Sequence, residues 1–110
     1  MDIEKLINDW RANVGDYARA KAQHDYLYEF RKSLKSILMT QAMSEGITAA
    51  NGQERYAYSH ERYLELLEGL KVATEQAEDL RYRMKIAETR VDVWRTEQAN
   101  GRKEKTMYGN

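Results

Sequence analysis

The sequence predicts an all-α fold: a long antiparallel helical hairpin or coiled coil that pairs into a four-helix assembly. Proline is absent from the 110 residues and a third of them are charged, a composition typical of long helices in contact with solvent. A heptad pattern from residue 63 to residue 98 alternates steps of three and four, so its mean period is 3.5 residues. A helix keeps such a stripe on one side only by supercoiling around a partner helix.

The first helix is expected over residues 3–44. Asp2 fits an N-cap, and Gly46 fits the left-handed position that commonly ends a helix. One side of this helix carries an apolar stripe: Ile3, Ile7, Trp10, Val14, Tyr17, Ala20, His24, Leu27, Phe30, Leu34, Ile37 and Gln41. Between His24 and Phe30 two three-residue steps follow each other, which predicts a stammer that overwinds the coil locally.

A connector over residues 45–58 joins this helix to a second one. Asn51-Gly52 is a turn signal, and Thr48 fits the cap of a short helical turn. The pattern leaves open whether residues 47–58 form a short helix or an extended segment.

The second helix is expected over about 59–100. Ser59 fits its N-cap, and Asn100-Gly101 is expected to end it. The remaining residues, 101–110, are expected to form a flexible basic tail. All of these elements belong to a single helical-hairpin domain that spans residues 1–110.

The heptad of the second helix defines the predicted packing seam. Its residues are Tyr63, Leu66, Leu70, Ala73, Ala77, Leu80, Met84, Ala87, Val91 and Trp94, and the pattern continues to Gln98. Large and small residues alternate along much of this seam, which lets facing side chains interdigitate.

A second apolar set lies off the seam and forms the candidate association face: Leu67, Val72, Tyr82, Ile86 and Val93. A helix that is apolar on more than one side is usually buried against more than one neighbour, which predicts a homodimer or higher assembly. Residues 59–79 carry six acidic and two basic side chains, whereas 81–105 carry eight basic and four acidic ones. This distribution favours antiparallel pairing of two such helices. Alternatively, the first helix and the connector cover the face, and the charges match the helix dipole.

The residue types argue against catalysis. Cysteine is absent, and the two histidines, His24 and His60, lack the spacing to a second ligand that a helical metal site requires. We expect His24 at the edge of the core and His60 exposed. We therefore predict a protein that is not an enzyme and has no catalytic residue, metal or cofactor.

Aromatic and basic residues alternate in two segments, and further cations lie near the C-terminus. The candidate nucleic-acid contacts are Arg31, Lys32, Lys35, Arg81, Arg83, Lys85, Arg102, Lys103 and Lys105. Exposed rings can stack on bases while cations hold phosphates. However, the formal net charge is zero, and basic residues beside a seam often lay their stems over apolar surface. Nucleic-acid binding is therefore the alternative to protein binding.

Nothing in the sequence predicts a membrane protein or a secreted one. The first five residues lack the apolar run of a signal peptide, and the longest uninterrupted apolar run, Ile37-Leu38-Met39, is far too short to span a bilayer. The absence of cysteine fits a reducing compartment. These features predict a cytoplasmic protein.

Residues 53–102 resemble a group of small, uncharacterised tailed-bacteriophage helical proteins. The resemblance is carried by Gln53-Glu54-Arg55, Ser59, Tyr63-Leu64, Leu67-Glu68-Gly69-Leu70, Leu80-Arg81 and the run from Arg90 to Asn100. Genes for such proteins often lie among phage recombination and replication genes. The resemblance implies an accessory protein of the infected cell's cytoplasm. It is expected to bind and modulate a partner in phage recombination or replication, or in host nuclease or defence machinery.

Overall fold

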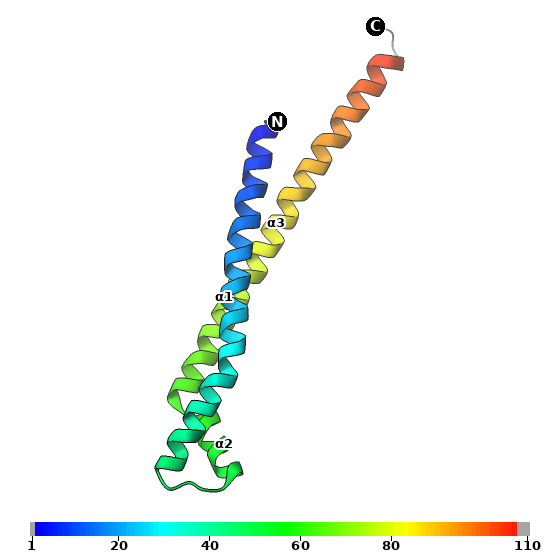
Figure 1. Cartoon of the computed structure of the whole chain (residues 1–110). Coiled ribbons are helices and arrows are strands. Elements are labelled where there is room, and N and C mark those ends of the chain that lie inside the picture. Colours follow the sequence, from blue (N-terminus) through cyan, green and yellow to red (C-terminus); the bar gives the residue numbers. More distant parts are fainter. Residues whose placement is uncertain (1, 108–110) are drawn as a thin grey trace. The chain divides into compact units, whose positions relative to one another are not determined.

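The computed structural model describes residues 2–107, which form three helices and no strand (Figure 1). The helices are α1 (Ile3–Ser44), α2 (Ala50–Ser59) and α3 (Glu61–Met107). The predicted all-α class is confirmed.

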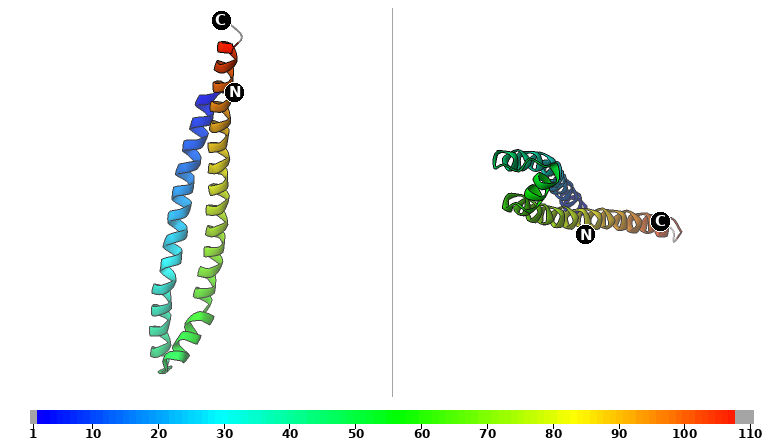
Figure 2. Two further views of the ribbon diagram at one scale, coloured as in Figure 1. Left: turned by 90° about the vertical axis from the view of Figure 1, so that its right-hand side faces the viewer. Right: turned by 90° about the horizontal axis from the view of Figure 1, so that it is seen from below.

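The chain divides into two compact units that share α1 and α3. Unit 1 contains α1 up to Arg19 and α3 from Glu78 onward, and unit 2 contains residues 20–77. Within each unit, the α1 and α3 segments run side by side in opposite directions, which is the helix pairing of an antiparallel hairpin (Figures 1 and 2). The single-domain organisation stays a prediction.

Both ends of α1 carry the capping groups that the sequence suggested. The Asp2 Oδ1 atom accepts a hydrogen bond from the Glu4 backbone N–H at 3.0 Å. At the other end Gly46 has a φ of +95°, and its N–H donates to the Met43 carbonyl while the Ile47 N–H donates to Ala42. This pair of bonds is the Schellman arrangement, in which glycine tolerates the left-handed backbone.

The buried side of α1 can be followed as a continuous heptad, but Phe30 of the predicted stripe is half-buried too and packs on the core, so the stammer stays a prediction. The buried and half-buried residues of this heptad include Ile3, Leu6, Trp10, Asn13, Tyr17, Ala20, His24, Leu27, Arg31, Leu34 and Leu38. Leu38 is fully buried, whereas the predicted stripe residues Ile37 and Val14 are 48% and 44% exposed. The predicted stripe uses the most apolar residue at each turn. In the structure, positions with regular heptad spacing include the polar residues Asn13 and Arg31, which are half-buried.

The ten predicted seam residues of α3 are all buried or half-buried in the structure. Between residues 61 and 107, Arg81 is the one further residue that is not exposed, and Gln98 at the end of the heptad is exposed. Val91 is 2% exposed and lies near the end of this buried side.

The connector contains a helix, α2, which settles the alternative that the sequence left open. Asn51-Gly52 was predicted as a turn, but both residues lie inside α2, and Ala49 rather than Thr48 is the N-cap. A Cβ at position 52 would lie 3.0 Å from Ile47 Cγ2. Glycine therefore serves here to let the backbone of α2 approach Ile47, and not to form a turn.

The start of α3 also differs from the prediction. Ser59 belongs to the last turn of α2, where its hydroxyl donates to the Arg55 carbonyl at 2.7 Å. The cap is instead His60, whose Nδ1 accepts the Arg62 backbone N–H at 3.0 Å. The His60 ring is half-buried, with its centroid 5.6 Å from that of Tyr56, so the expectation of an exposed His60 is wrong.

The predicted end of the second helix at Asn100-Gly101 is wrong, because α3 continues to Met107. A single glycine costs a helix only about 1 kcal/mol relative to alanine, and the Arg, Lys and Glu residues that follow are good helix formers. Residues 101–107 are thus helical, and the rest of the predicted tail, 108–110, lies outside the described residues.

Unit 2 has a compact core where α2 bridges the facing ends of α1 and α3 (Figure 2). The buried cluster consists of Leu34, Leu38, Ala57 and Tyr63, packed against Phe30, Met39 and Leu66. Lys35 connects α1 to α2: its Nζ donates to Glu54 Oε1 at 3.2 Å and lies 4.9 Å from the Tyr58 ring centroid. Hydrogen bonding to Tyr58, and then to Glu54, raises the pKa of Lys35.

Two neighbouring residues of α1 test the register. We expect Leu38→Ala to lower the free energy of unfolding by about 2–5 kcal/mol, because it empties a fully buried site. Ile37→Ala should cost less than about 1 kcal/mol, because Ile37 is half exposed. Denaturant unfolding followed by circular dichroism measures both. Equal losses, or a larger loss for Ile37→Ala, would contradict the register.

Two glycines test the cap at the end of α1. Gly46→Ala should lower the free energy of unfolding by about 1 kcal/mol, since alanine is strained at a positive φ. Gly69→Ala should raise it by up to about 1 kcal/mol, because this glycine lies inside α3 with open space around its Cβ position. Thermal melts of the two variants would refute the assignment if both moved in the same direction.

Candidate protein-interaction surface

In unit 1, a narrow core joins the α1 and α3 segments. Leu6, Ala87 and Val91 are buried there, at 9%, 7% and 2% exposure. Two antiparallel helices cover each other along one side only, so both flanks of this pair remain accessible. Each flank contains a groove between the helices.

The first groove, which we call the apolar flank, is lined by Ile7, Trp10, Val14 and Val91. Ile7 and Val14 are seven residues apart and therefore lie on the same side of α1, two turns from each other. Arg11 from α1 and Arg95 from α3 complete the lining, in a groove of about 400 Å³. The apolar flank thus combines an aromatic and aliphatic floor with two guanidinium groups.

The second groove, which we call the charged flank, brings together side chains of opposite sign from the two helices. α1 contributes Asp9 and Asp16, and α3 contributes Arg83 and Arg90. Each pair is seven residues apart, so each forms a row along its helix. The groove has a volume of about 460 Å³, and Leu6, Ala12, Asn13, Ile86 and Ala87 complete its lining.

Two of the four charges of the charged flank, Asp16 and Arg83, make ion pairs along their own helices. Asp16 pairs with Arg19, and Arg83 Nε lies 2.9 Å from Asp79 Oδ2. Among the ion pairs of residues 2–107, none crosses this groove from α1 to α3. The two rows of charge therefore face the groove without neutralising each other directly.

The candidate association face is exposed at all five predicted positions. In unit 1, Tyr82, Ile86 and Val93 are 56%, 54% and 46% exposed, and Ile86 also lines the charged flank. In unit 2, Leu67 and Val72 are 39% and 46% exposed. The alternative in which the first helix and the connector bury this face is therefore wrong.

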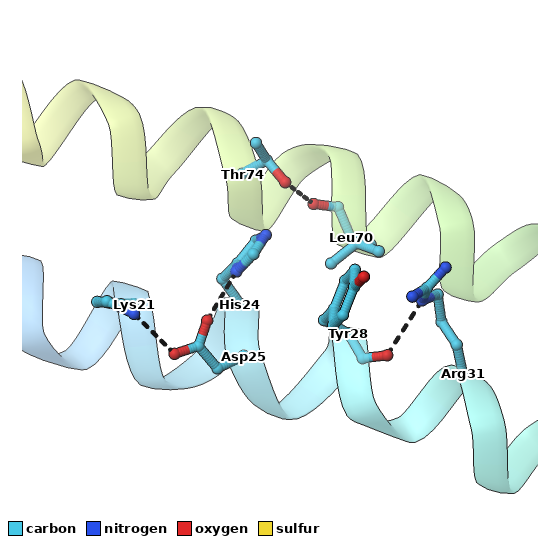
Figure 3. A network of polar contacts seen from close by, with 7 residues as sticks. All are labelled: Lys21, His24, Asp25, Tyr28, Arg31, Leu70 and Thr74. Atoms are coloured by element: carbon cyan, nitrogen blue, oxygen red, sulfur yellow. Dashed lines mark hydrogen bonds and ion pairs between the residues drawn. The ribbon is translucent and has the colours of Figure 1, made fainter.

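The candidate nucleic-acid contacts of unit 2 are engaged in local interactions. The Arg31 guanidinium lies 4.0 Å from the Tyr28 ring centroid, and its Nε donates to the Tyr28 carbonyl at 3.0 Å (Figure 3). Lys32 lies 3.4 Å from a Glu29 carboxylate oxygen, and Lys35 binds Glu54. Rings and cations of this unit satisfy one another, as expected for a structural role.

His24 lies on the buried side of α1 and points toward α3 (Figure 3). Its Nδ1 is 3.0 Å from Asp25 Oδ1, and the Lys21 ammonium is 2.9 Å from the other oxygen of that carboxylate. Hydrogen bonds from Lys21, and then from His24, lower the pKa of Asp25. On α3 the Thr74 hydroxyl donates to the Leu70 carbonyl. His24 is thus a half-buried residue at the edge of the core, as the sequence predicted.

The candidate nucleic-acid contacts of unit 1 divide into two groups. Arg81 donates to Glu78 at 2.8 Å, which raises the pKa of Arg81, and its guanidinium lies 4.7 Å from the Tyr82 ring centroid. Arg83 pairs with Asp79, and Lys85 lies 6.0 Å from Tyr82. The second group is exposed on the last turns of α3 and comprises Arg102, Lys103 and Lys105.

The described residues form no candidate metal site. Within residues 2–107, groups of three or more His, Asp or Glu side chains that could hold a metal ion are absent. None of the helices in that range is long and apolar enough to cross a membrane.

Sequence reasoning missed both grooves, although their residues carry a signal. Asp9 and Asp16 repeat at seven residues, as do Arg83 and Arg90, and each pair flanks a heptad. The register of α1 was needed to recognise that these rows meet. Comparisons with protein-family models, with curated proteins and with solved structures give no significant match, so the candidate surface is defined by the geometry of the chain itself.

Proposed function

We propose that this chain is a non-enzymatic, phage-encoded interaction protein that binds and modulates another protein. The observation that carries the proposal is the apolar flank, where Ile7, Trp10, Val14 and Val91 line an open groove between two helices. Such a groove suits the helix-in-groove mode, in which a partner helix places its apolar side between two others.

The composition of the apolar flank is that of a binding hot spot. Tryptophan and arginine are enriched among the residues that contribute most to protein interfaces, and both types line this groove. Val14 is 44% exposed, so a partner that covers it would remove apolar surface from water. Arg11 and Arg95 would select a partner that carries carboxylates beside its apolar residues.

The class of partner is proposed from the resemblance of residues 53–102 to tailed-phage proteins. A phage recombination or replication protein, or a host nuclease or defence complex, would meet this protein in the cytoplasm of the infected bacterium. Self-association into a four-helix assembly is part of the same proposal, and the exposed residues Tyr82, Ile86 and Val93 support it.

A second candidate function is accessory binding of nucleic acid by the end of α3. Arg102, Lys103 and Lys105 are exposed there, and the ion pairs of residues 2–107 do not include them. Three cations within one helical turn and a half can hold phosphates. The apolar flank nevertheless favours a protein partner over nucleic acid, because it offers apolar surface as well as charge.

The apolar flank is tested with two exposed apolar residues, one in the groove and one outside it. Val14→Glu places a charge in the groove, and we expect it to reduce the amount of partner captured from infected cells at least about tenfold. Leu64→Glu is the matched control, since Leu64 is 53% exposed and lies in unit 2, outside the apolar flank and the candidate association face. Quantitative mass spectrometry of proteins captured by the folded variants measures both. Equal capture by the Val14→Glu variant and the parent would refute the proposal.

The alternative is tested by replacing Arg102, Lys103 and Lys105 with glutamine and titrating single-stranded DNA at several salt concentrations. We expect the parent to show no steep salt-dependent binding. If nucleic acid is the ligand, the parent should bind with a steep salt dependence, and losing three cations should flatten the slope by about two units. That second result would promote the alternative over protein binding.

A further inference from the structure

We infer that a second copy of this chain binds the charged flank of unit 1, with a two-fold axis that runs along the helices. The inference rests on the self-association included in the proposed function, and it specifies the face and the orientation. It is carried by the two rows of opposite charge and by the exposed apolar residue between them.

The positions of the charges follow from the antiparallel direction of the two helices. α1 and α3 run in opposite directions in unit 1 and all four residues line the same groove, so the order Asp9, Asp16 along α1 runs beside the order Arg90, Arg83 along α3. Viewed into the groove, one helix presents a column of carboxylates and the other a column of guanidinium groups. All four residues are exposed, and no ion pair crosses between the columns among the described residues.

This arrangement is complementary to itself in one orientation. A rotation of 180° about an axis parallel to the helices places α1 of one copy opposite α3 of the other. Asp9 then faces Arg90 of the second copy and Asp16 faces its Arg83, and both contacts occur twice in the dimer. A rotation about a perpendicular axis would place α1 against α1, so that carboxylates face carboxylates and guanidinium groups face each other, which is unfavourable.

Apolar contact is needed as well, since exposed ion pairs alone contribute little. Ile86 lies between Arg83 and Arg90 on α3, lines the charged flank and is 54% exposed. The groove leaves about 460 Å³ beside Ile86 that side chains of a facing copy can fill. Tyr82 and Val93, also exposed, lie on the same helix within two turns of Ile86. The contact thus has an apolar centre with charges on both sides.

A second copy fits this surface better than a partner of one charge. An acidic helix would pair with Arg83 and Arg90 but would be repelled by Asp9 and Asp16, and a basic helix would meet the opposite problem. A suitable partner must present two columns of opposite sign at the spacing of two helical turns, and this chain itself does so.

The experiment is a charge exchange between the two columns. One variant combines Arg83→Glu with Arg90→Glu, so that both columns are acidic. The other combines Asp9→Lys with Asp16→Lys, so that both are basic. Each variant alone should lose self-association, with a Kd at least about tenfold above that of the parent in sedimentation equilibrium. An equimolar mixture should form a mixed dimer in native mass spectrometry, because every facing pair is then of opposite sign.

A control variant separates the loss of specific contacts in the groove from a general effect of net charge. Arg62→Glu with Lys71→Glu changes the net charge as much as the first variant at exposed positions of unit 2, outside the groove, and should leave the Kd within about twofold. If the charge-reversed variants do not fold by circular dichroism, Arg83→Gln with Arg90→Gln provides the test, and it should raise the Kd by several-fold.

Three results would overturn the inference. They are a parent that is monomeric at tens of micromolar, variants that associate as well as the parent, or a mixture without mixed dimers. Unchanged association of the variants would indicate an interface elsewhere or the perpendicular axis. Partner capture by the Arg83→Glu/Arg90→Glu variant distinguishes this failure from that of the proposed function, because the apolar flank is intact in that variant.

Discussion

The pairing of α1 with α3 along two matching heptads is the interaction on which both compact units are built. In each unit the buried side of one helix is covered by the other, and the buried set is small: Leu6, Ala87 and Val91 in unit 1, and Leu34, Leu38, Ala57 and Tyr63 in the core cluster of unit 2. A core of this kind tolerates few losses, since each fully buried leucine or valine contributes about 1.5–3 kcal/mol. The Schellman turn at Gly46 and the cap at His60 position the helices so that the heptads meet.

The same narrow core explains why so much apolar surface remains available to partners. A helix pair buries one stripe of each helix, so apolar residues that flank the stripe stay exposed unless a third element covers them. In unit 2, α2 covers part of the pair, and its own residue Ala57 is fully buried in the contact. In unit 1, the apolar flank and the charged flank are both open grooves. A partner protein on the apolar flank and a second copy on the charged flank would each cover one of these grooves.

The sequence predicted the seam of α3 because each of its ten positions carries an apolar residue at heptad spacing. The register of α1 was harder, because Asn13 and Arg31 occupy seam positions while Val14 and Ile37 stand beside them. The polar residues can be accommodated there because a seam two helices thick leaves their ends near water.

The predicted turn at Gly52 and the predicted cap at Ser59 were wrong because local propensity was overridden. Each residue favours turns or caps, but packing in and around α2 places both residues inside that helix. The grooves could not be predicted from one helix, because residues of both helices line them. Asp9 and Arg90 can be assigned to the same groove only when the register of α1 against α3 is known. Tyr82, Ile86 and Val93 could be found from one helix alone, since they share a side of α3.

Nuclear Overhauser contacts in the isotope-labelled protein can decide whether α1 and α3 pack through continuous heptads. We expect the Tyr63 ring to show contacts with the methyl groups of Leu34 and Leu38, and the Trp10 ring to show contacts with those of Val91. Contacts from Tyr63 to Ile37 in place of Leu38, or no contact between Trp10 and Val91, would contradict this packing.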